Sequence, residues 1–406
     1  MTTLISFLGA TDYRDTIYVY RSRKSHATRY MADAAMALFE PAPQRLLVVV
    51  TEEARTKHLE ALTRNLSGVI EPEPVMIPSG QSEAEQWTIF ERIAAQIRPN
   101  EELIFDITNG FRSIPVLALL IAAYVRVARR ATVRHLIYGA FDARNPDNET
   151  PVFDLTPLAA LLEWTTATDA LLKYGRADAL RDLVQQLAHA RSSSNQLAQQ
   201  LHQLTAALQA SRPAEVMRTA ATLPEALAAF SEPNATDGST RPLGLLLGAI
   251  EQEYGPMALA QPYERRLARE VIGKQLEMIE WYVAKGLYVQ AFTLTREWLI
   301  SVVLAAADSD GAYDLYSESD RKLAETAING YDQTSESPPR PVPTRILEIA
   351  NQPAIRSLWK DCRALRNDLA HAGMRRSPEA AEQVEKRVRA VCSRLRPALQ
   401  ALGFEV

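Results

Sequence analysis

Short apolar runs alternate with helical patterns through the first 158 residues. The apolar runs, each typical of a buried strand, are Leu4–Leu8, Leu46–Val50, Leu103–Ile107 and His135–Gly139. The helical patterns between them cover Ala27–Phe39, Glu52–Leu66, Ser82–Ile97 and Ile114–Ala128. Continuous apolar strands that alternate with helices are typical of a parallel sheet covered on both faces. The pattern therefore predicts an α/β domain with a parallel-rich sheet over residues 1–158.

The rest of the chain has only helical patterns. Residues 159–255, rich in Leu, Gln and Ala, are expected to form a helical linker region interrupted by a loop after Phe230. Residues 256–406 are expected to form an all-α bundle. Its clearest helices are Tyr288–Ala307 and a segment near residue 360. In the latter, an apolar stripe recurs at helical spacing: Ile355, Leu358, Cys362, Leu365 and Leu369.

Composition limits the classes of function. The 406 residues have a formal net charge of −4, so any contact with RNA must be a local basic site. Two cysteines, Cys362 and Cys392, allow no disulfide framework, and the scattered histidines lead us to expect no metal site. The apolar run at the start is too short for a signal peptide, and Arg126 interrupts the longest apolar stretch. These features predict a cytoplasmic protein with no membrane partner.

Two of the predicted strands end in unusual sequences. The first strand runs into FLGATDY, where Gly9 permits a tight turn or the close approach of a ligand. Leu103–Ile107 runs into TNGFRSIP, where Ser113 can cap the following helix and Arg112 adds a positive charge. Because ligands of parallel sheets bind beyond the carboxyl ends of strands, we predict a phosphate-binding site there. We also expect a valine in place of Gly110 to fill space that the ligand needs.

Two other interpretations of these strand ends follow from residue type. Turns of Gly, Asn and Ser are common in any such sheet, and Arg112 could be a solvated surface charge. A dinucleotide site is disfavoured because FLGATDY lacks three spaced glycines that lead into a helix. The segment YRDTIYVY that follows is more typical of a strand than of a helix.

The helix near residue 360 ends in RALRNDLAHAG, which contains Arg366, Asn367 and His371. Histidine moves protons near neutral pH, and arginine binds phosphate oxygens, so the pair suits metal-free RNA cleavage. Arg366 and His371 differ by about 140° around an ideal helix, which favours a site completed across a dimer. Gly373 suits a helix end near His371. The alternative is that His371 only stabilises that helix end through the helix dipole.

The motifs at the two ends of the chain resemble those of one known family. DITNGFRSIP follows a strand and has the pattern Asp-x-Thr-x-Gly-x-Arg, and RNDLAH has an Arg-x4-His spacing. Together with FLGATDY and REWL at Arg296–Leu299, they make the chain resemble the CARF–HEPN accessory ribonucleases of type III CRISPR systems. The resemblance implies a Rossmann-like CARF domain (1–158), a helical linker region (159–255) and an all-α HEPN ribonuclease domain (256–406).

The resemblance also implies an activity. The CARF domain would bind cyclic oligoadenylate, with cyclic tetra-adenylate favoured over the hexa-adenylate, and thereby activate antiviral cleavage of single-stranded RNA. No cofactor is implied. The family forms homodimers, whose two-fold axis suits a ring ligand, so a homodimer or higher homo-oligomer is expected. The implied ligand-binding residues are Gly9, Ala10, Thr11, Tyr13, Ser79, Gly80, Asn109, Gly110, Phe111, Arg112 and Ser113. The implied catalytic residues are Arg366 and His371, with Asn367 positioning them or the RNA.

Two alternatives remain open from the sequence. One is a ligand-sensing CRISPR regulator without nuclease activity, although no helix-turn-helix with a basic recognition helix is evident. The other is a HEPN toxin-type protein that acts on a target other than RNA.

Overall fold

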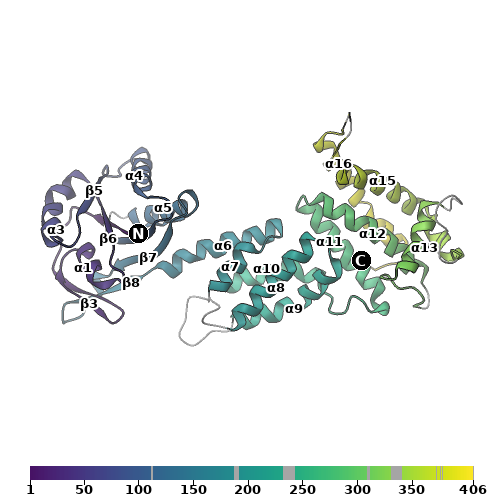
Figure 1. The fold of residues 1–406 in the computed structure, drawn as a ribbon, viewed down its shortest axis with the longest axis horizontal. Coiled ribbons are helices and arrows are strands. Elements are labelled where there is room, and N and C mark those ends of the chain that lie inside the picture. The colour runs from purple at the N-terminus through teal and green to yellow at the C-terminus, as the bar shows by residue number, and fades with distance from the viewer. Residues whose placement is uncertain are drawn as a thin grey trace. The chain divides into compact units, whose positions relative to one another are not determined.

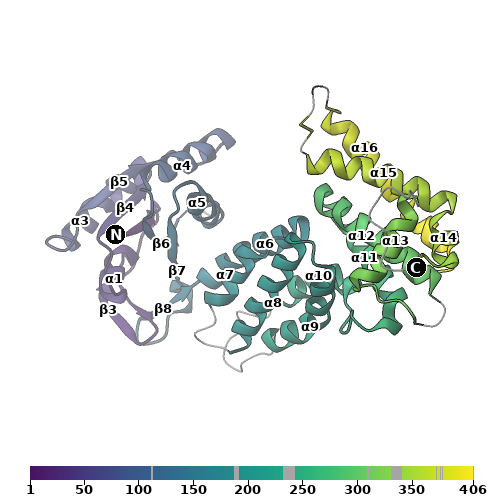
Figure 2. The same ribbon diagram turned by 45° about the vertical axis from the view of Figure 1, so that its right-hand side comes forward.

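The chain folds into two compact units, Met1–Glu163 and Trp164–Val406, in a computed structural model shown from two directions in Figures 1 and 2. The structure describes residues 1–110, 113–186, 192–231, 243–308, 311–330, 341–371, 373–374, 376 and 378–405. The predicted bundle, and the predicted linker region from Trp164 onward, thus lie in the second unit.

The first unit is built on one mixed sheet. Its strands, in spatial order β3-β2-β8-β7-β6-β1-β4-β5, contain a parallel core from β7 to β5, while β8 is antiparallel to β7 and β3 to β2. The parallel-rich α/β fold predicted from the sequence is therefore confirmed. The strands are β1 Thr2–Leu8, β2 Thr16–Tyr20, β3 Arg23–Thr28, β4 Arg45–Val50, β5 Pro72–Met76, β6 Glu102–Asn109, β7 Thr132–Gly139 and β8 Glu149–Asp154.

Helices cover both faces of this sheet (Figure 1). One apolar core joins the sheet to α1 and α3, and a second joins it to α4 and α5. Every residue of β1 is consequently buried, which explains its uninterrupted apolar sequence. The helices are α1 Met31–Leu38, α2 Glu52–Ala54, a π-helical turn Arg55–Leu59, α3 Glu60–Asn65, α4 Glu83–Gln96, α5 Ile114–Ala128 and a 3₁₀ turn Phe141–Ala143.

One predicted helix begins too early. The sequence pattern predicted a helix over Ala27–Phe39, but β3 extends to Thr28 and α1 begins at Met31. The strand forms because β3 pairs with β2, and the Ser25 hydroxyl also accepts a hydrogen bond from the Tyr18 N–H at 3.0 Å. This pairing depends on a neighbouring strand, which helical periodicity does not register. The strand-like character predicted for the segment after Gly9 is confirmed by β2.

The second unit is helical throughout the part that the structure describes. Its central helix, α12, packs against α11, α13, α14 and α15. The helices are α6 Thr156–Tyr174 (which begins in the first unit), α7 Asp178–Gln186, α8 Ser192–Gln209, α9 Pro213–Ser231, α10 Leu243–Tyr254, α11 Ala268–Ala284, α12 Tyr288–Ala307, α13 Glu318–Asn329, α14 Thr344–Ala350, α15 Pro353–Ala370, α16 Ala381–Cys392 and α17 Leu395–Ala401, with 3₁₀ turns at Gly255–Met257 and Arg265–Leu267.

Helix α12 matches the predicted range Tyr288–Ala307. It is long and apolar enough to cross a membrane, but most of it is buried against neighbouring helices, as expected for the centre of a bundle. Trp298 anchors it to α11 through a hydrogen bond from its indole N–H to the Ile272 carbonyl at 3.0 Å. The apolar stripe of α15 faces inward, with Ile355, Leu358, Cys362 and Leu365 buried and Leu369 half-buried.

Candidate functional site

The topology of the first unit places two predicted ligand-binding segments side by side. The chain proceeds from β1 to β4 and β5 on one side, and from β6 to β7 on the other, so the strand order reverses between β1 and β6. Ligands of open α/β sheets bind beyond the carboxyl ends of the strands at such a switch point. Leu8 pairs with Asn109 at this end, which brings Gly9 next to Asn109 and Gly110.

The turn after β1 is held by Tyr13. Its hydroxyl accepts a hydrogen bond from the Gly9 N–H at 2.7 Å and donates one to the Gly9 carbonyl at 2.8 Å. Burial raises the pKa of Tyr13 to about 12, so the hydroxyl keeps its proton. A Cβ atom at position 9 would lie 2.9 Å from the Asn109 carbonyl oxygen, so this close approach of two backbones requires glycine.

The π-helical turn after α2 supplies two residues that the sequence analysis missed. Lys57 Nζ donates to the Ala10 carbonyl, and His58 Nε2 lies 2.8 Å from the Thr11 carbonyl. The His58 ring also stacks on Tyr13 with a centroid distance of 4.4 Å. Burial lowers the pKa of His58, which favours the neutral ring with a proton on Nε2 for that hydrogen bond. Only tertiary contact reveals this role, although π-helical turns often occur at functional sites.

A buried carboxyl group, Asp106, lies in β6 three residues before the strand ends at Asn109. The Ser6 hydroxyl donates to one of its oxygens at 2.5 Å, and the Thr108 N–H donates to the other at 2.9 Å. Burial raises the pKa of Asp106 above its ordinary value of 3.8 despite these two donors. Asp106 thus links β6 to β1 through Ser6 and fixes the backbone at Thr108, close to the end of β6.

Replacing Asp106 by asparagine tests this description. A carboxyl whose pKa is higher in the folded protein adds stability at low pH and loses that contribution as the pH rises through the folded pKa. Asp106→Asn should therefore raise Tm relative to wild type more at pH 8 than at pH 4. Each kcal/mol gained in the free energy of unfolding corresponds to roughly 2–4 °C in Tm. Thermal unfolding at both pH values measures this, with the exposed Asp147→Asn as the matched control. An equal effect of Asp106→Asn at both pH values would contradict the assignment.

The end of β6 contains an unpaired donor. Asn109 Nδ2 is buried and has no hydrogen-bond partner among the described residues, an arrangement that is costly unless a ligand supplies one. Gly110 packs closely against α5, because a Cβ atom there would lie 2.6 Å from Ile114 Cγ2. Valine at position 110 would therefore disturb the start of α5 in any case, and its expected effect on ligand space stays a prediction.

The start of α5 corrects a further expectation. Ser113 occupies the N-cap position, but its side chain makes no capping hydrogen bond. Its backbone is already in the helical region, whereas a capping side chain normally needs an extended one. Phe111 and Arg112, both predicted to bind the ligand, lie outside the described residues.

Ser79 and Gly80 lie apart from the other predicted ligand residues. They follow β5, which is separated from β1 by β4. Gly80 has a φ of +73°, and its carbonyl accepts a hydrogen bond from Gln86 Nε2 at 2.6 Å. The glycine is thus explained by the turn that leads into α4.

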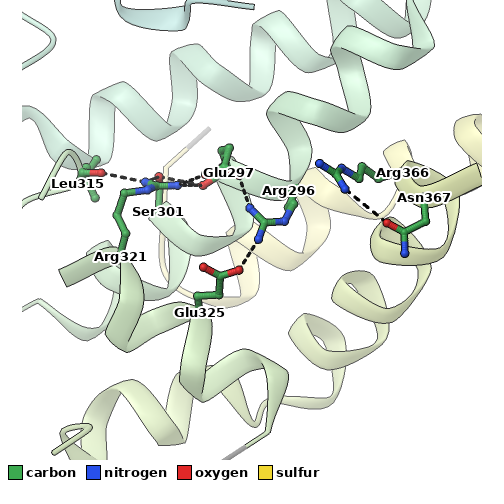
Figure 3. Close-up of polar contacts among 8 residues, drawn as sticks. All are labelled: Arg296, Glu297, Ser301, Leu315, Arg321, Glu325, Arg366 and Asn367. Carbon is green, nitrogen blue, oxygen red and sulfur yellow. Dashed lines mark hydrogen bonds and ion pairs between the residues drawn. The ribbon is translucent and has the colours of Figure 1, made fainter. Parts of the chain in front are cut away.

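The predicted nuclease residues lie at the end of α15. Arg366, Asn367 and His371 are all exposed, and His371 is the C-cap, with its N–H donating to the Asn367 carbonyl at 3.0 Å. Gly373 has a φ of +65° and its N–H donates to the Asp368 carbonyl, so the predicted helix end is confirmed. Asn367 and His371 line a hollow of about 260 Å³. Arg366 Nη1 lies 3.4 Å from Asn367 Oδ1 (Figure 3).

An ion-pair network supports this region from α12 (Figure 3). Arg296, in the REWL sequence, pairs with Glu297 and with Glu325 of α13, and its guanidinium lies 5.6 Å from the centre of the Trp359 ring. Arg321 in turn pairs with Glu297 at 2.7 Å. Arg296 is thus a structural cation whose charge is already balanced by carboxylates, whereas Arg366 forms no ion pair among the described residues.

Cys362 lies within the electrostatic reach of Arg296 and Arg366. Burial raises the pKa of its thiol to about 12, so the thiol stays protonated and inert. Among the residues that the structure describes, no group of three His, Cys, Asp or Glu side chains could hold a metal ion.

Comparison with known proteins gives matches to two domain families. Residues 3–142 match the family model of the CARF domain of the CRISPR system endoribonuclease Csx1. Residues 160–256 match the second domain of the CRISPR-associated protein MJ1674. The MJ1674 protein of Methanocaldococcus jannaschii is 25% identical over 101 residues, which make up 25% of this chain and 16% of that relative.

A solved structure is also similar over the whole chain. It is Enterococcus italicus Csm6 bound to cyclic hexa-2'-fluoro-hexa-dAMP, with a TM-score of 0.49, 13% sequence identity, and coverage of 100% of this chain and 95% of that one. The predicted Rossmann-like first domain is confirmed by the Csx1 CARF match. Residues 3–142 are thus similar to a CARF domain, and residues 160–256 to the second domain of a CRISPR-associated protein.

Proposed function

We propose that the protein is a single-stranded RNA endoribonuclease of type III CRISPR defence that cyclic oligoadenylate activates. The observation that carries the proposal is the presence, in a chain with a Csx1-type CARF domain, of an exposed arginine and histidine at the end of one helix, free of ion pairs among the described residues. The proposal locates the enzyme in the cytoplasm, and treats residues 256–406 as a HEPN ribonuclease domain.

The proposed ligand site is the switch point between β1 and β6. Gly9 keeps the backbone accessible, and the buried Asn109 Nδ2 needs an acceptor such as a phosphate or adenine atom. Lys57 places a cation at the Ala10 carbonyl, where it also pairs with Asp12 at 2.8 Å. Ala10, Thr11 and Tyr13 belong to the same turn, whereas Ser79 and Gly80 are weaker candidates because they follow β5. Ring size is not specified by these groups, and cyclic tetra-adenylate remains the favoured ligand from the motif resemblance.

The proposed homodimer is supported by an apolar face of α5. Val116, Leu120, Tyr124 and Val127 recur at helical spacing and are each more than half exposed. Tyr124 continues into an aromatic cluster, since its ring lies 5.2 Å from that of Phe90, which contacts Trp87. Exposed apolar faces of this kind mark protein interfaces. Because α5 begins next to the ligand site, pairing through α5 would bring two such sites together under one ring.

The proposed chemistry uses the ribose 2′-hydroxyl as the nucleophile. His371 would take the proton of the 2′-hydroxyl as its oxygen attacks the neighbouring phosphorus, the P–O5′ bond would break, and a proton would return to the leaving 5′-oxygen. Arg366 would stabilise charge on the phosphate, with Asn367 positioning either group or the RNA. No metal is required for this reaction. A second copy of α15 across the two-fold axis would complete the site, because one helix does not direct Arg366 and His371 to the same point.

Arg112→Ala should weaken binding of cyclic oligoadenylate at least tenfold. Loss of one charge-assisted phosphate contact costs on the order of 1.5–3 kcal/mol. Calorimetric titration measures the affinity, and Arg129→Ala, at the exposed opposite end of α5, is the matched control. Equal affinity of wild type and folded Arg112→Ala would remove Arg112 from the proposed site.

The deciding experiment measures RNA cleavage with and without each cyclic oligoadenylate. Cleavage that only one ring size stimulates is the expected result. Ligand binding without cleavage would instead favour a CRISPR regulator. Absence of both would favour a toxin-type protein with another target.

A further inference from the structure

The exposed face of α15 carries a row of cations that leads to the proposed nuclease residues. Arg356, Lys360 and Arg363 are followed at the same helical spacing by Asn367 and His371, so the intervals are four, three, four and four residues. Residues at these intervals lie along one face of a helix. At 1.5 Å per residue the row spans about 22 Å from Arg356 to His371. All five side chains are exposed.

A groove lies along this row of side chains. Arg356, Lys360 and Arg363 line a groove of about 540 Å³, together with Trp359 and with Asn329 of α13. The Trp359 indole N–H donates to Asn329 Oδ1 at 3.0 Å, which joins the two walls. Ala364 and Asn367 line both this groove and the hollow beside His371. The basic groove therefore continues into the proposed site of cleavage.

The charges in this groove are unusual for their surroundings. No carboxylate lies within ion-pair distance of Arg356, Lys360 or Arg363 in the described structure. Neighbouring cations are paired: Arg345 with Glu348, Lys386 with Glu382, Arg389 with Glu385 and Arg394 with Asp361. In a chain with a net charge of −4, three adjacent unpaired cations indicate a surface suited to an anionic polymer.

We infer that this groove, formed by Arg356, Lys360 and Arg363, binds the phosphates of the RNA strand that leads to the cleavage site. The inference rests on the proposed function for the cleavage step, but it assigns a separate binding surface. An unbranched strand of phosphates matches a straight row of exposed cations, and charge contacts of this type hold single strands without reading their sequence. The three side chains act on RNA affinity, not on the chemical step.

The test measures binding of a single-stranded RNA in which every 2′-hydroxyl is methylated, so that no strand can be cut. The triple variant R356A/K360A/R363A should bind this RNA roughly 100-fold more weakly at about 100 mM salt, and its plot of log affinity against log salt should be less steep by about 2. The control R345A/K386A/R389A removes the same three charges from paired, exposed positions. It should bind within about twofold of wild type, because these cations already have partners.

A second variant adds charge without removing a side chain. Ala364→Glu introduces a carboxylate on the exposed wall shared by the two hollows, and should weaken binding about as much as one lost cation. Wild-type affinity and salt slope in both the triple variant and Ala364→Glu would overturn the inference. An acidic protein segment would then be the alternative partner of the groove. If groove-dependent binding is found but the wild type cuts no RNA, the nuclease proposal fails and the binding surface stands. If the triple variant cuts RNA with the KM of wild type, the nuclease proposal stands and the proposed binding surface fails.

Discussion

His371→Ala should reduce ligand-stimulated RNA cleavage by roughly 10²–10⁴-fold, the usual contribution of a general acid or base. His371 is the exposed histidine that caps α15, and the neighbouring Asn367 shares its hollow. Arg366→Ala should have a loss of similar size, because the crowded phosphate would lose its cation. Initial rates with labelled single-stranded RNA and saturating ligand measure both effects. Affinity for cyclic oligoadenylate and the dimeric state should be unchanged in both variants.

The controls separate chemistry from folding. His202→Ala removes an exposed histidine from α8 of the same unit, and Arg345→Ala removes an exposed arginine from α14; both should cleave at the wild-type rate. Wild-type cleavage should persist in EDTA and leave a 2′,3′-cyclic phosphate, since the attacking group is the neighbouring hydroxyl. Cleavage by His371→Ala at the wild-type rate would reduce the histidine to a helix cap. Inhibition by EDTA would place the active site elsewhere.

Gly9→Ala should weaken ligand binding roughly ten- to a hundredfold and destabilise the first unit. The new Cβ would lie 2.9 Å from the Asn109 carbonyl oxygen, so the ends of β1 and β6 must separate, at a cost of about 1–3 kcal/mol. Separation also disturbs the Tyr13 hydroxyl, which bonds both polar groups of Gly9. Calorimetric affinity for cyclic oligoadenylate and thermal unfolding measure the two effects.

The matched control is Gly248→Ala in α10. The added methyl group meets nothing within 4 Å there, and alanine is a better helix former than glycine by about 1 kcal/mol. This variant should therefore bind ligand normally and unfold at a slightly higher temperature. If Gly9→Ala binds as well as Gly248→Ala does, then the β1–β6 junction is not the ligand site.

Local pattern was sufficient for most elements of the fold. The apolar runs of β1, β4 and β6 and the helical periodicity of α5, α12 and α15 are visible in the sequence because both sheet faces and one face of each helix are buried. The end of α15 was also predictable, since Gly373 supplies the left-handed turn that stops a helix. Helix α1 was placed too early because β3 is stabilised by its pairing with β2, a contact that periodicity does not contain.

The candidate ligand site shows the same division. Gly9 and Asn109 were identified from the sequence because both follow apolar strands, but their adjacency depends on the order in which β1 and β6 pair. Lys57 and His58 were not identified, since each acts through a residue more than 40 positions away. Asp106 belongs to the Asp-x-Thr-x-Gly-x-Arg pattern but was given no role, because its role depends on burial and on Ser6. Gly110 was predicted to bind the ligand from residue type alone, whereas its close packing against Ile114 is visible only in the tertiary structure.

The sequence by itself determined the buried strands β1, β4, β6 and β7, most of the helices, and which residues could bind phosphate or move a proton. The tertiary structure decided which of those residues meet. It separated Ser79 and Gly80 from the β1–β6 switch point and aligned three cations of α15 with the hollow beside His371. Among the described residues, it also left Asn109 Nδ2 without a hydrogen-bond partner and those three cations without an ion pair. The physical reason is that burial and pairing of charges depend on neighbours distant in sequence, whereas periodicity reports only which face of an element is apolar.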